Sequence, residues 1–286
     1  MTQNILDFYK LQGARTTVKP NIFDNFPSDI KQICQIIQGL LVHPGMLSTY
    51  NLQLPKKRIE DRYIKTIQEN IDQILKIENK SLIEPRIPKN RIVNICRHFS
   101  MFLCSVLREK GIPARCRCGF STYNGNGNNG WFGDHWICEY WNKKEKRWIK
   151  VDSQLDDIHI LKRHLDINII NPIDLPKETF FCGGVLWRLY RQGLISGDLC
   201  GYSPKENDYG EWYIRGNMLR DFFALNKIEY TYQEKSKLMD KNYQPKTEEL
   251  FLLDKIADLT INVDENFDQL IDFYKKNQNL IPNYTL

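Results

Sequence analysis

The feature that most constrains the fold is a change of hydrophobic period between residues 94 and 152. Up to Lys110, apolar side chains recur every three or four positions, and beyond Gly111 they alternate every two. The first period predicts a helix from Asn94 to about Lys110, and the second predicts strands. Gly111 suits the position just past a helix end, and Pro113 blocks continuation. The stretch therefore predicts a largely buried helix that leads directly into a sheet.

Three strands are predicted beyond this helix, and the second and third form a hairpin around a polar turn centred on Lys144. In that register Trp136 faces Asp152 and His135 faces Ser153, and the prediction allows an offset of one residue. The predicted order is thus a helix followed by an antiparallel meander. The strands are expected over 114–123, 135–141 and 147–152.

Helical periodicity is also found on both sides of this stretch. A helix capped by Ser28 is expected first, and a second is expected from about Arg58 to Ile77. We predict an α+β fold, with a core over residues 22–170 and a helical extension over 171–286 packed on it. The helices of the extension are expected at 183–193, 211–226, 247–260 and 265–277.

Composition narrows the class of protein. The chain has 286 residues, of which 42% are hydrophobic, so it can bury a sizeable core. Its net charge of +5 is spread without blocks, which argues against nucleic acid or a membrane surface as a partner. No apolar run approaches ~18 residues and no export signal is seen. We expect a cytoplasmic protein with reduced cysteines, and the sequence does not indicate its oligomeric state.

Cys96 is the candidate nucleophile. With Asn94 as N-cap, it would be the second residue of the predicted helix, where the helix dipole favours a thiolate. The backbone N–H groups there could also hold an oxyanion. The alternative is a buried core cysteine, the more common role of the residue. Cys104, Cys116, Cys118 and Cys138 are assigned that role.

His135 and Asp152 are the candidate base and its orienting carboxylate. His135 opens one predicted strand, and Asp152 ends the next, so the hairpin could bring their side chains together. The alternatives are a strand histidine bonded to a neighbour and a turn carboxylate. His98 lies two positions after Cys96 on the same helix, so the two side chains do not face each other.

Other patterns do not indicate a cofactor or a metal. The glycines from Gly125 to Gly130 spell a dinucleotide fingerprint, but a strand is predicted after them where that motif needs a helix. They are better interpreted as a loop that could cover the site. Cys116 and Cys118 lack the spacing of zinc ligands. We therefore expect no cofactor and no metal.

The run from Cys96 through Gly-Ile-Pro-Ala-Arg115 resembles the signature of the transglutaminase-like superfamily, whose core is papain-like. His135-Trp136 with Glu139, and Val151-Asp152, are similar to its later motifs. Two departures are Trp136 directly after the histidine and Ser153 in place of the common proline. The resemblance covers roughly residues 90–155.

The resemblance implies a nucleophile helix packed on an antiparallel sheet, with Cys96, His135 and Asp152 as triad. It implies cysteine-dependent acyl transfer or hydrolysis on an amide, through a thioester, with a protein, peptide or small-molecule substrate. Family members often place a side-chain oxyanion donor upstream, and Asn90 is the candidate here. The alternative is a catalytically silent binding module that keeps the fold.

Overall fold

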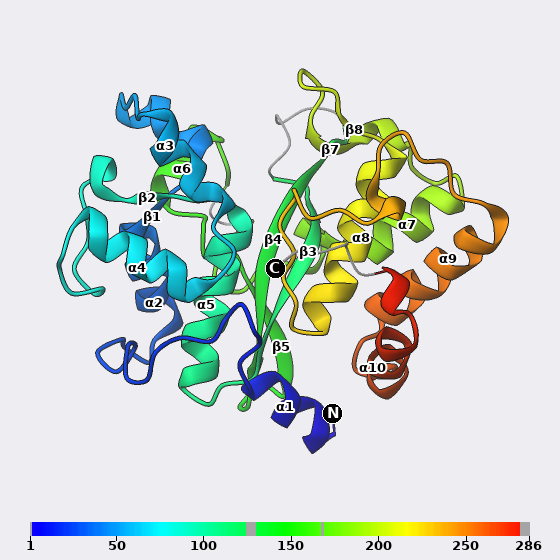
Figure 1. Ribbon diagram of the computed structural model, residues 1–286, viewed down its shortest axis with the longest axis horizontal. Helices are drawn as coiled ribbons and strands as arrows, with labels where there is room; N and C mark the ends of the chain where they lie inside the picture. The colour runs from blue at the N-terminus through cyan, green and yellow to red at the C-terminus, as the bar shows by residue number, and fades with distance from the viewer. Residues whose placement is uncertain (1, 124–129, 167–168, 281–286) are drawn as a thin grey trace. The chain divides into compact units, whose positions relative to one another are not determined.

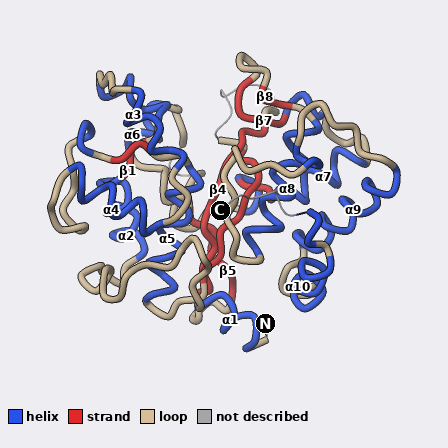
Figure 2. The backbone as a smooth tube through the Cα atoms, in the orientation of Figure 1, coloured by secondary structure: helices blue, strands red, loops and turns tan. Residues whose placement is uncertain are grey.

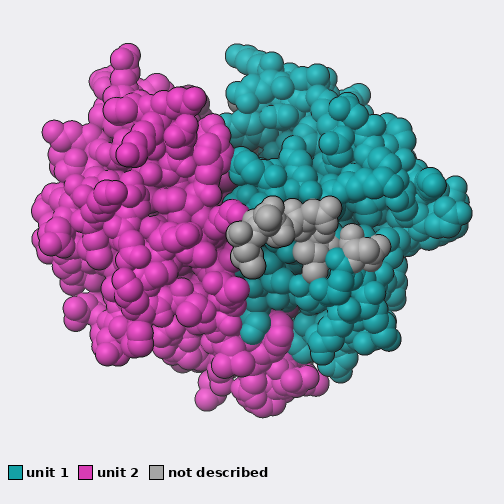
Figure 3. All heavy atoms as spheres, viewed as in Figure 1, with its two compact units in different colours: residues 1, 117–136, 176–286 teal, residues 2–116, 137–175 magenta. Residues whose placement is uncertain are grey.

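The computed structural model describes residues 2–123, 130–166 and 169–280, in two compact units (Figure 3). Unit 1 comprises residue 1, 117–136 and 176–286, and unit 2 comprises 2–116 and 137–175. The predicted domains, 22–170 and 171–286, stay a prediction. The two units are defined by compact packing, which does not by itself establish domains. The predicted glycine-rich loop lies outside the described residues.

Unit 2 is built around a single helix, α5 (Cys96–Glu109), which contacts three other helices (Figure 2). Its remaining elements begin near the N-terminus and end with the hairpin and a short helix. They are α1 (Gln3–Lys10), α2 (Ile30–Leu40), β1 (Leu41–Val42), η1 (Pro44–Tyr50), α3 (Lys56–Ile59), η2 (Glu60–Tyr63), α4 (Ile67–Ile77), η3 (Pro88–Asn90), β2 (Ile92–Val93), β5 (Arg147–Val151) and α6 (Asp157–Lys162).

Unit 1 holds three helices that pack on one another, α7, α8 and α9, with short strands beside them (Figure 1). The four helices predicted after residue 182 are confirmed within two residues at either end. The elements are η4 (Lys177–Thr179), β6 (Phe180–Cys182), α7 (Gly183–Arg191), η5 (Gly197–Leu199), β7 (Cys200–Ser203), β8 (Asp208–Tyr209), α8 (Glu211–Leu225), η6 (Lys237–Met239), α9 (Thr247–Ile261), α10 (Phe267–Lys276) and η7 (Gln278–Leu280).

Strands β3 (Ala114–Ser121) and β4 (Phe132–Asn142) include residues of both units. The six-stranded sheet has the order β6-β3-β4-β7-β8, with β5 also paired to β4. The mixed helical and strand content confirms the α+β class. The sequence missed β6, β7 and β8, which lie in the region predicted as helical. The β4–β7 pair is parallel, so the sheet is not wholly antiparallel as predicted.

The predicted helix from Arg58 to Ile77 is wrong in its first half. The long helix α4 begins only at Ile67 because Thr66 caps it: the Thr66 hydroxyl accepts from the Glu69 N–H at 3.2 Å, and the Glu69 carboxylate accepts from the Thr66 N–H at 3.0 Å. The helix predicted after Ser28 is α2, and its start shifts by one residue for a similar reason, since Asp29 and not Ser28 accepts from the Gln32 N–H. It is not the first helix as expected, because α1 precedes it.

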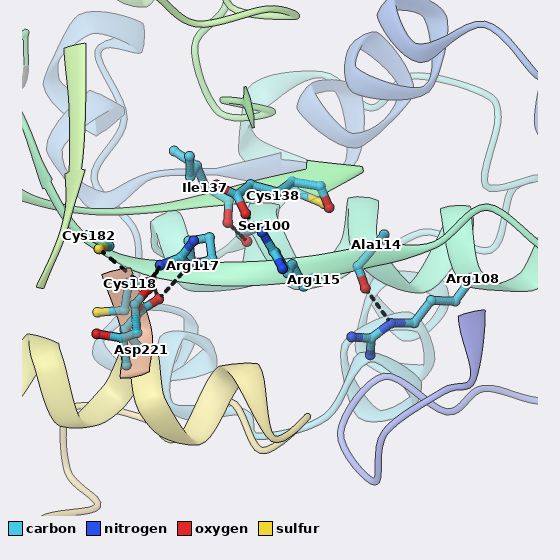
Figure 4. Close-up of polar contacts among 12 residues, drawn as sticks. Ser100, Arg108, Ala114, Arg115, Arg117, Cys118, Ile137, Cys138, Cys182 and Asp221 are labelled. Atoms are coloured by element: carbon cyan, nitrogen blue, oxygen red, sulfur yellow. Dashed lines mark hydrogen bonds and ion pairs between the residues drawn. The ribbon is translucent and has the colours of Figure 1, made fainter. Parts of the chain in front are cut away.

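Helix α5 is buried from Cys96 to Arg108, as the apolar period predicted. A helix buried all round must satisfy its polar side chains internally. Ser100 Oγ donates to Ile137 O at 2.6 Å, and Arg108 Nε donates to Ala114 O at 3.0 Å (Figure 4). Ser105 Oγ donates to Thr16 O at 2.6 Å. These bonds to backbone carbonyls fix the helix against the surrounding chain of unit 2.

The end of α5 follows the predicted turn chemistry. Gly111 has φ +70°, the left-handed conformation that glycine adopts without strain. Its N–H donates to Arg108 O at 2.9 Å, and the Ile112 N–H donates to Leu107 O at 2.9 Å. These two bonds form a Schellman motif, which ends the helix and directs the chain into β3.

The start of α5 carries a buried, neutral histidine. His98 Nδ1 accepts from the Ile95 N–H at 3.4 Å, while Nε2 donates to Ile64 O at 2.8 Å. The bond to Ile64 O places the proton on Nε2. Burial, with the Arg97 charge beside it, lowers the pKa of His98 to about 3. His98 is therefore a structural residue of unit 2.

Unit 1 depends on a buried ion pair between β3 and α8. Arg117 donates from Nε to Asp221 Oδ1 at 2.9 Å and from a terminal nitrogen to Asp221 Oδ2 at 2.8 Å (Figure 4). The same Arg117 nitrogen donates to Thr260 O, and the Cys118 N–H donates to Asp221 Oδ1. The pair thus connects one strand to two helices.

The His98 arrangement predicts a pH effect on stability. The folded-state pKa of His98, about 3, is below its unfolded value of about 6.5, so the unfolded chain binds one more proton between these values. The contribution of the neutral His98 to the free energy of unfolding is fully present above pH 6.5 and is lost as the pH falls below that value. A His98→Gln variant should lack this loss, which amounts to about 1.4 kcal/mol per pH unit. Urea titrations from pH 7 to 4.5 compare the two slopes, and identical slopes would contradict the assignment.

Removing one partner of the Arg117–Asp221 pair should be costly, because a buried charge is left uncompensated. We expect Asp221→Asn to lower the free energy of unfolding by about 3 kcal/mol or more. The matched control is Asp272→Asn, which breaks the exposed Lys276–Asp272 pair and should cost less than about 0.5 kcal/mol. Equal losses in urea titrations of the two variants would show that the buried pair is dispensable.

Candidate active site

Cys96 is the first residue of α5, one position earlier in the helix than predicted. The N-cap is Ile95, not Asn94. The Asn94 side chain donates to Val93 O at 2.9 Å and to Asp61 O at 3.3 Å, so it is bonded away from the first turn. The N–H of the N-cap residue, Ile95, donates instead to the ring of His98. Cys96 still stands at the positive end of the helix dipole.

The chain before Cys96 is held in place by the pairing of β1 with β2. The two strands are parallel, with Leu41 opposite Ile92 and Val42 opposite Val93. The Asn94 N–H continues the ladder by donating to Val42 O at 3.0 Å. Cys96 follows two residues later and is 7% exposed. The position of its thiol within unit 2 is therefore fixed from both sides, by this ladder and by α5.

His135 lies in β4, in the part of that strand that belongs to unit 1. It is 2% exposed, and its ring meets the Tyr123 ring edge-on with centroids 5.8 Å apart. The neighbouring side chains of Asp134 and Trp136 project to the other face of the strand, as strand geometry requires. Both of those side chains are bonded within unit 1.

Asp152 directly follows β5 in unit 2 and is 2% exposed. Its Oδ1 accepts from the Gln154 N–H at 3.0 Å, and its own N–H donates to Pro172 O at 2.8 Å. The first bond is the turn contact that was the alternative reading of this residue. A carboxylate has capacity for further acceptor bonds, so the turn contact and a catalytic role are compatible.

Asp152 also lines a pocket of about 340 Å³ in unit 2. The walls combine apolar side chains with an amide, a carboxylate and a thiol, among them Ile170, Gln38, Asp156 and Cys34. Burial raises the pKa of the Cys34 thiol, and the negative charge of Asp152 adds to the effect. Cys34 is therefore a protonated thiol beside the candidate carboxylate and not a competing nucleophile.

The hairpin register differs from the predicted one by one residue. Cys138 pairs with Val151, and the ladder continues to Asn142 opposite Arg147. The loop is closed by Asn142 Oδ1, which accepts from the N–H groups of Lys144 and Glu145. This closure leaves four residues in the loop, whereas a turn centred on Lys144 had placed Trp136 opposite Asp152. The Trp136–Asp152 pairing is thus replaced by a register one residue away, within the offset that the prediction allowed.

The structure places Cys96 and Asp152 in unit 2 and His135 in unit 1, and each is fixed by contacts within its own unit. The meeting of the three side chains in one site stays a prediction. Asn90, the oxyanion candidate, ends η3, and its Nδ2 donates to Glu78 Oε2 at 3.1 Å. The side-chain donor of Asn90 is thus bonded to a carboxylate, and its catalytic role also stays a prediction.

The remaining cysteines behave as core residues. All eight cysteines are free thiols, and all are buried. Burial raises the pKa values of Cys104 and Cys138, and it raises that of Cys200 to about 12. These groups stay protonated at neutral pH and are poor nucleophiles. Across residues 2–123, 130–166 and 169–280, no group of three or more His, Cys, Asp or Glu side chains is placed to hold a metal ion.

No pattern in the sequence indicated the polar network of unit 1 around Asp134. Tyr232 and Asn217 donate to its Oδ1 at 2.8 and 2.6 Å, and Tyr213 donates to Oδ2 at 3.1 Å. These donors come from a part of the chain without a chemical motif, 79 to 98 residues after the aspartate. Only tertiary packing brings them to β4.

Within the described residues, no helix has both the length and the apolar character needed to cross a bilayer.

Comparison with protein families agrees with the resemblance noted in the sequence. The model of the transglutaminase-like superfamily matches residues 89–153, a segment that includes Cys96, His135 and Asp152 as well as Asn90. No curated protein and no solved structure matches the chain significantly. Residues 89–153 thus carry a transglutaminase-like superfamily domain, as the run from Cys96 to Arg115 indicated.

Proposed function

We propose that the protein is a cysteine-dependent enzyme that transfers or hydrolyses acyl groups of amides. The observation that carries the proposal is the position of Cys96, the first residue of a buried helix, within a segment that matches a transglutaminase-like model. The same segment supplies His135 and Asp152, the other two residue types that a thiol-based triad needs. In general terms, the match supports cysteine-based acyl transfer or hydrolysis.

Cys96 is the proposed nucleophile. Its thiol must lose a proton to attack, and the N-terminus of α5 stabilises a negative charge there. A nearby imidazolium adds to the stabilisation, and we assign that role to His135. Asp152 accepts the second ring N–H of the histidine and so fixes its tautomer. The amides at the start of α5, with Asn90 as a further candidate, are proposed to hold the oxyanion.

The reaction then has two stages. The Cys96 thiolate attacks the amide carbonyl carbon, a C–S bond forms, and His135 protonates the departing nitrogen as the C–N bond breaks. The product is a thioester on Cys96 and a free amine. In the second stage His135 removes a proton from water or from an acceptor amine, which displaces the thiolate. Water gives hydrolysis, and an amine gives a new amide.

The substrate is proposed to be an amide of a protein glutamine, a peptide or a small molecule. The 340 Å³ pocket beside Asp152 has the size of a small-molecule site. The competing proposal is a silent binding module that retains the fold without the chemistry. The two proposals differ in the reactivity of Cys96, because only an enzyme needs a thiolate near neutral pH.

We expect iodoacetamide at pH 6 to alkylate Cys96 at least about tenfold faster than the other seven cysteines, because an ion pair with His135 keeps it ionised. Mass spectrometry of peptides after timed quenching measures each site. Cys96→Ala is the control and should remove the fast phase alone. If Cys96 reacts no faster than Cys182, which is similarly exposed at 9%, the silent module is the better description.

Asp152→Ala should remove the fast reaction of Cys96 at pH 6, because the imidazole is no longer held in one tautomer. We expect a loss of roughly tenfold or more at pH 6 and little change at pH 9, where the thiol ionises unaided. Asp157→Ala removes the same charge from an exposed position on the same pocket wall and is the matched control. Equal effects of the two substitutions would contradict a specific role for Asp152.

A further inference from the structure

We infer that the hydroxyl of Tyr232 is a positioning group for His135, an inference that rests on the proposed function. Tyr232 lies 96 residues beyond Trp136, in a segment without regular secondary structure, and belongs to unit 1 like the histidine. It does not act on the substrate in this proposal. It holds the strand segment that carries the catalytic ring.

The geometry is a clamp on the two residues that flank His135. The Tyr232 hydroxyl accepts from Trp136 Nε1–H at 2.9 Å and donates to Asp134 Oδ1 at 2.8 Å. One phenol oxygen therefore bonds the side chains before and after the histidine. Because side chains alternate along a strand, both bonds lie on the face opposite the His135 ring.

The Asp134 end of the clamp is held by α8. Asn217 Nδ2 donates to Asp134 Oδ1 at 2.6 Å and to Gly119 O at 3.1 Å. Arg220 donates to Asn217 Oδ1 at 3.2 Å, which sets the orientation of that amide. The Arg220 guanidinium also lies 4.5 Å from the centre of the Tyr232 ring. The carboxylate is thus surrounded by donors that have fixed partners of their own.

At the other end of the clamp, the indole N–H of Trp136 depends on the Tyr232 oxygen. Trp136 is 1% exposed, so its indole N–H has no access to solvent and needs an acceptor in the protein. Without the phenol oxygen, that N–H would be buried without a partner or would draw β4 out of position. A shift of the strand at residues 134 and 136 moves the ring between them, and displacements near 1 Å can reduce catalysis about a hundredfold.

On the other face, His135 meets the ring of Tyr123 edge-on. That contact restricts where the imidazole can lie. The clamp and the Tyr123 contact together leave the histidine one backbone position and a restricted set of ring orientations. Such rigid support around a catalytic group is what triad chemistry requires, because the imidazole must transfer its proton at a fixed distance.

The test is Tyr232→Phe, which deletes one oxygen and keeps the ring. The matched control is Tyr243→Phe, since Tyr243 is also a phenol of unit 1 and donates to the Glu249 carboxylate, away from β4. Alkylation of Cys96 is measured from pH 5 to 9 in the full chain. We expect Tyr232→Phe to lose about tenfold or more of the fast reaction at pH 6, and Tyr243→Phe to match the wild type.

The outcomes separate this inference from the proposed function. A wild-type protein without fast alkylation at pH 6 overturns the proposed function, and the positioning role with it. A fast wild-type reaction that survives Tyr232→Phe overturns the positioning role alone. If Tyr232→Phe does not fold, as judged by circular dichroism, Trp136→Phe breaks the same clamp from its other end. A folded Trp136→Phe variant with wild-type alkylation at pH 6 would likewise exclude the inference.

Discussion

A helix with no solvent-exposed side along most of its length is the constraint on which unit 2 depends. Helix α5 is buried from Cys96 to Arg108 although it carries serine, histidine and arginine. Burial of such groups is tolerable only where each finds a partner. Here the partners are backbone carbonyls outside the helix, at Thr16, Ala114 and Ile137 among others. The need to satisfy these groups therefore fixes the helix within the unit.

The position of the candidate nucleophile follows from that constraint. A helix anchored along its length cannot slide or rotate, so its first residue has one place in unit 2. The β1–β2 ladder and the neutral His98 hold the preceding residues in the same way. In unit 1 the corresponding support for His135 comes from a phenol, a carboxylate and an indole. In both units, the bonds are made by the residues on either side of the candidate residue, and they fix its position through the backbone.

Local signals predicted much of this correctly. The change of period at Gly111 marked the helix-to-sheet boundary, and the four helices after residue 182 followed from their apolar spacing. Local signals were also misjudged: Thr66 and Glu69 spell a capping box that splits the predicted helix, and Ile95 replaces Asn94 as the N-cap. A polar side chain can cap a helix only if it is not bonded elsewhere. Asn94 does not cap α5 because its side chain is bonded to Val93 O and Asp61 O.

The sequence by itself determined the α+β class, the burial of the helix that begins at Cys96, and the candidate residues, because periodicity and residue spacing are local properties. Tertiary structure alone decided the joining of β6, β7 and β8 to the sheet and the clamp of Tyr232 on both sides of His135. Those features join side chains and strands up to about a hundred residues apart. Such partners are chosen by packing and by the need to satisfy buried polar groups, which the order of residues does not display.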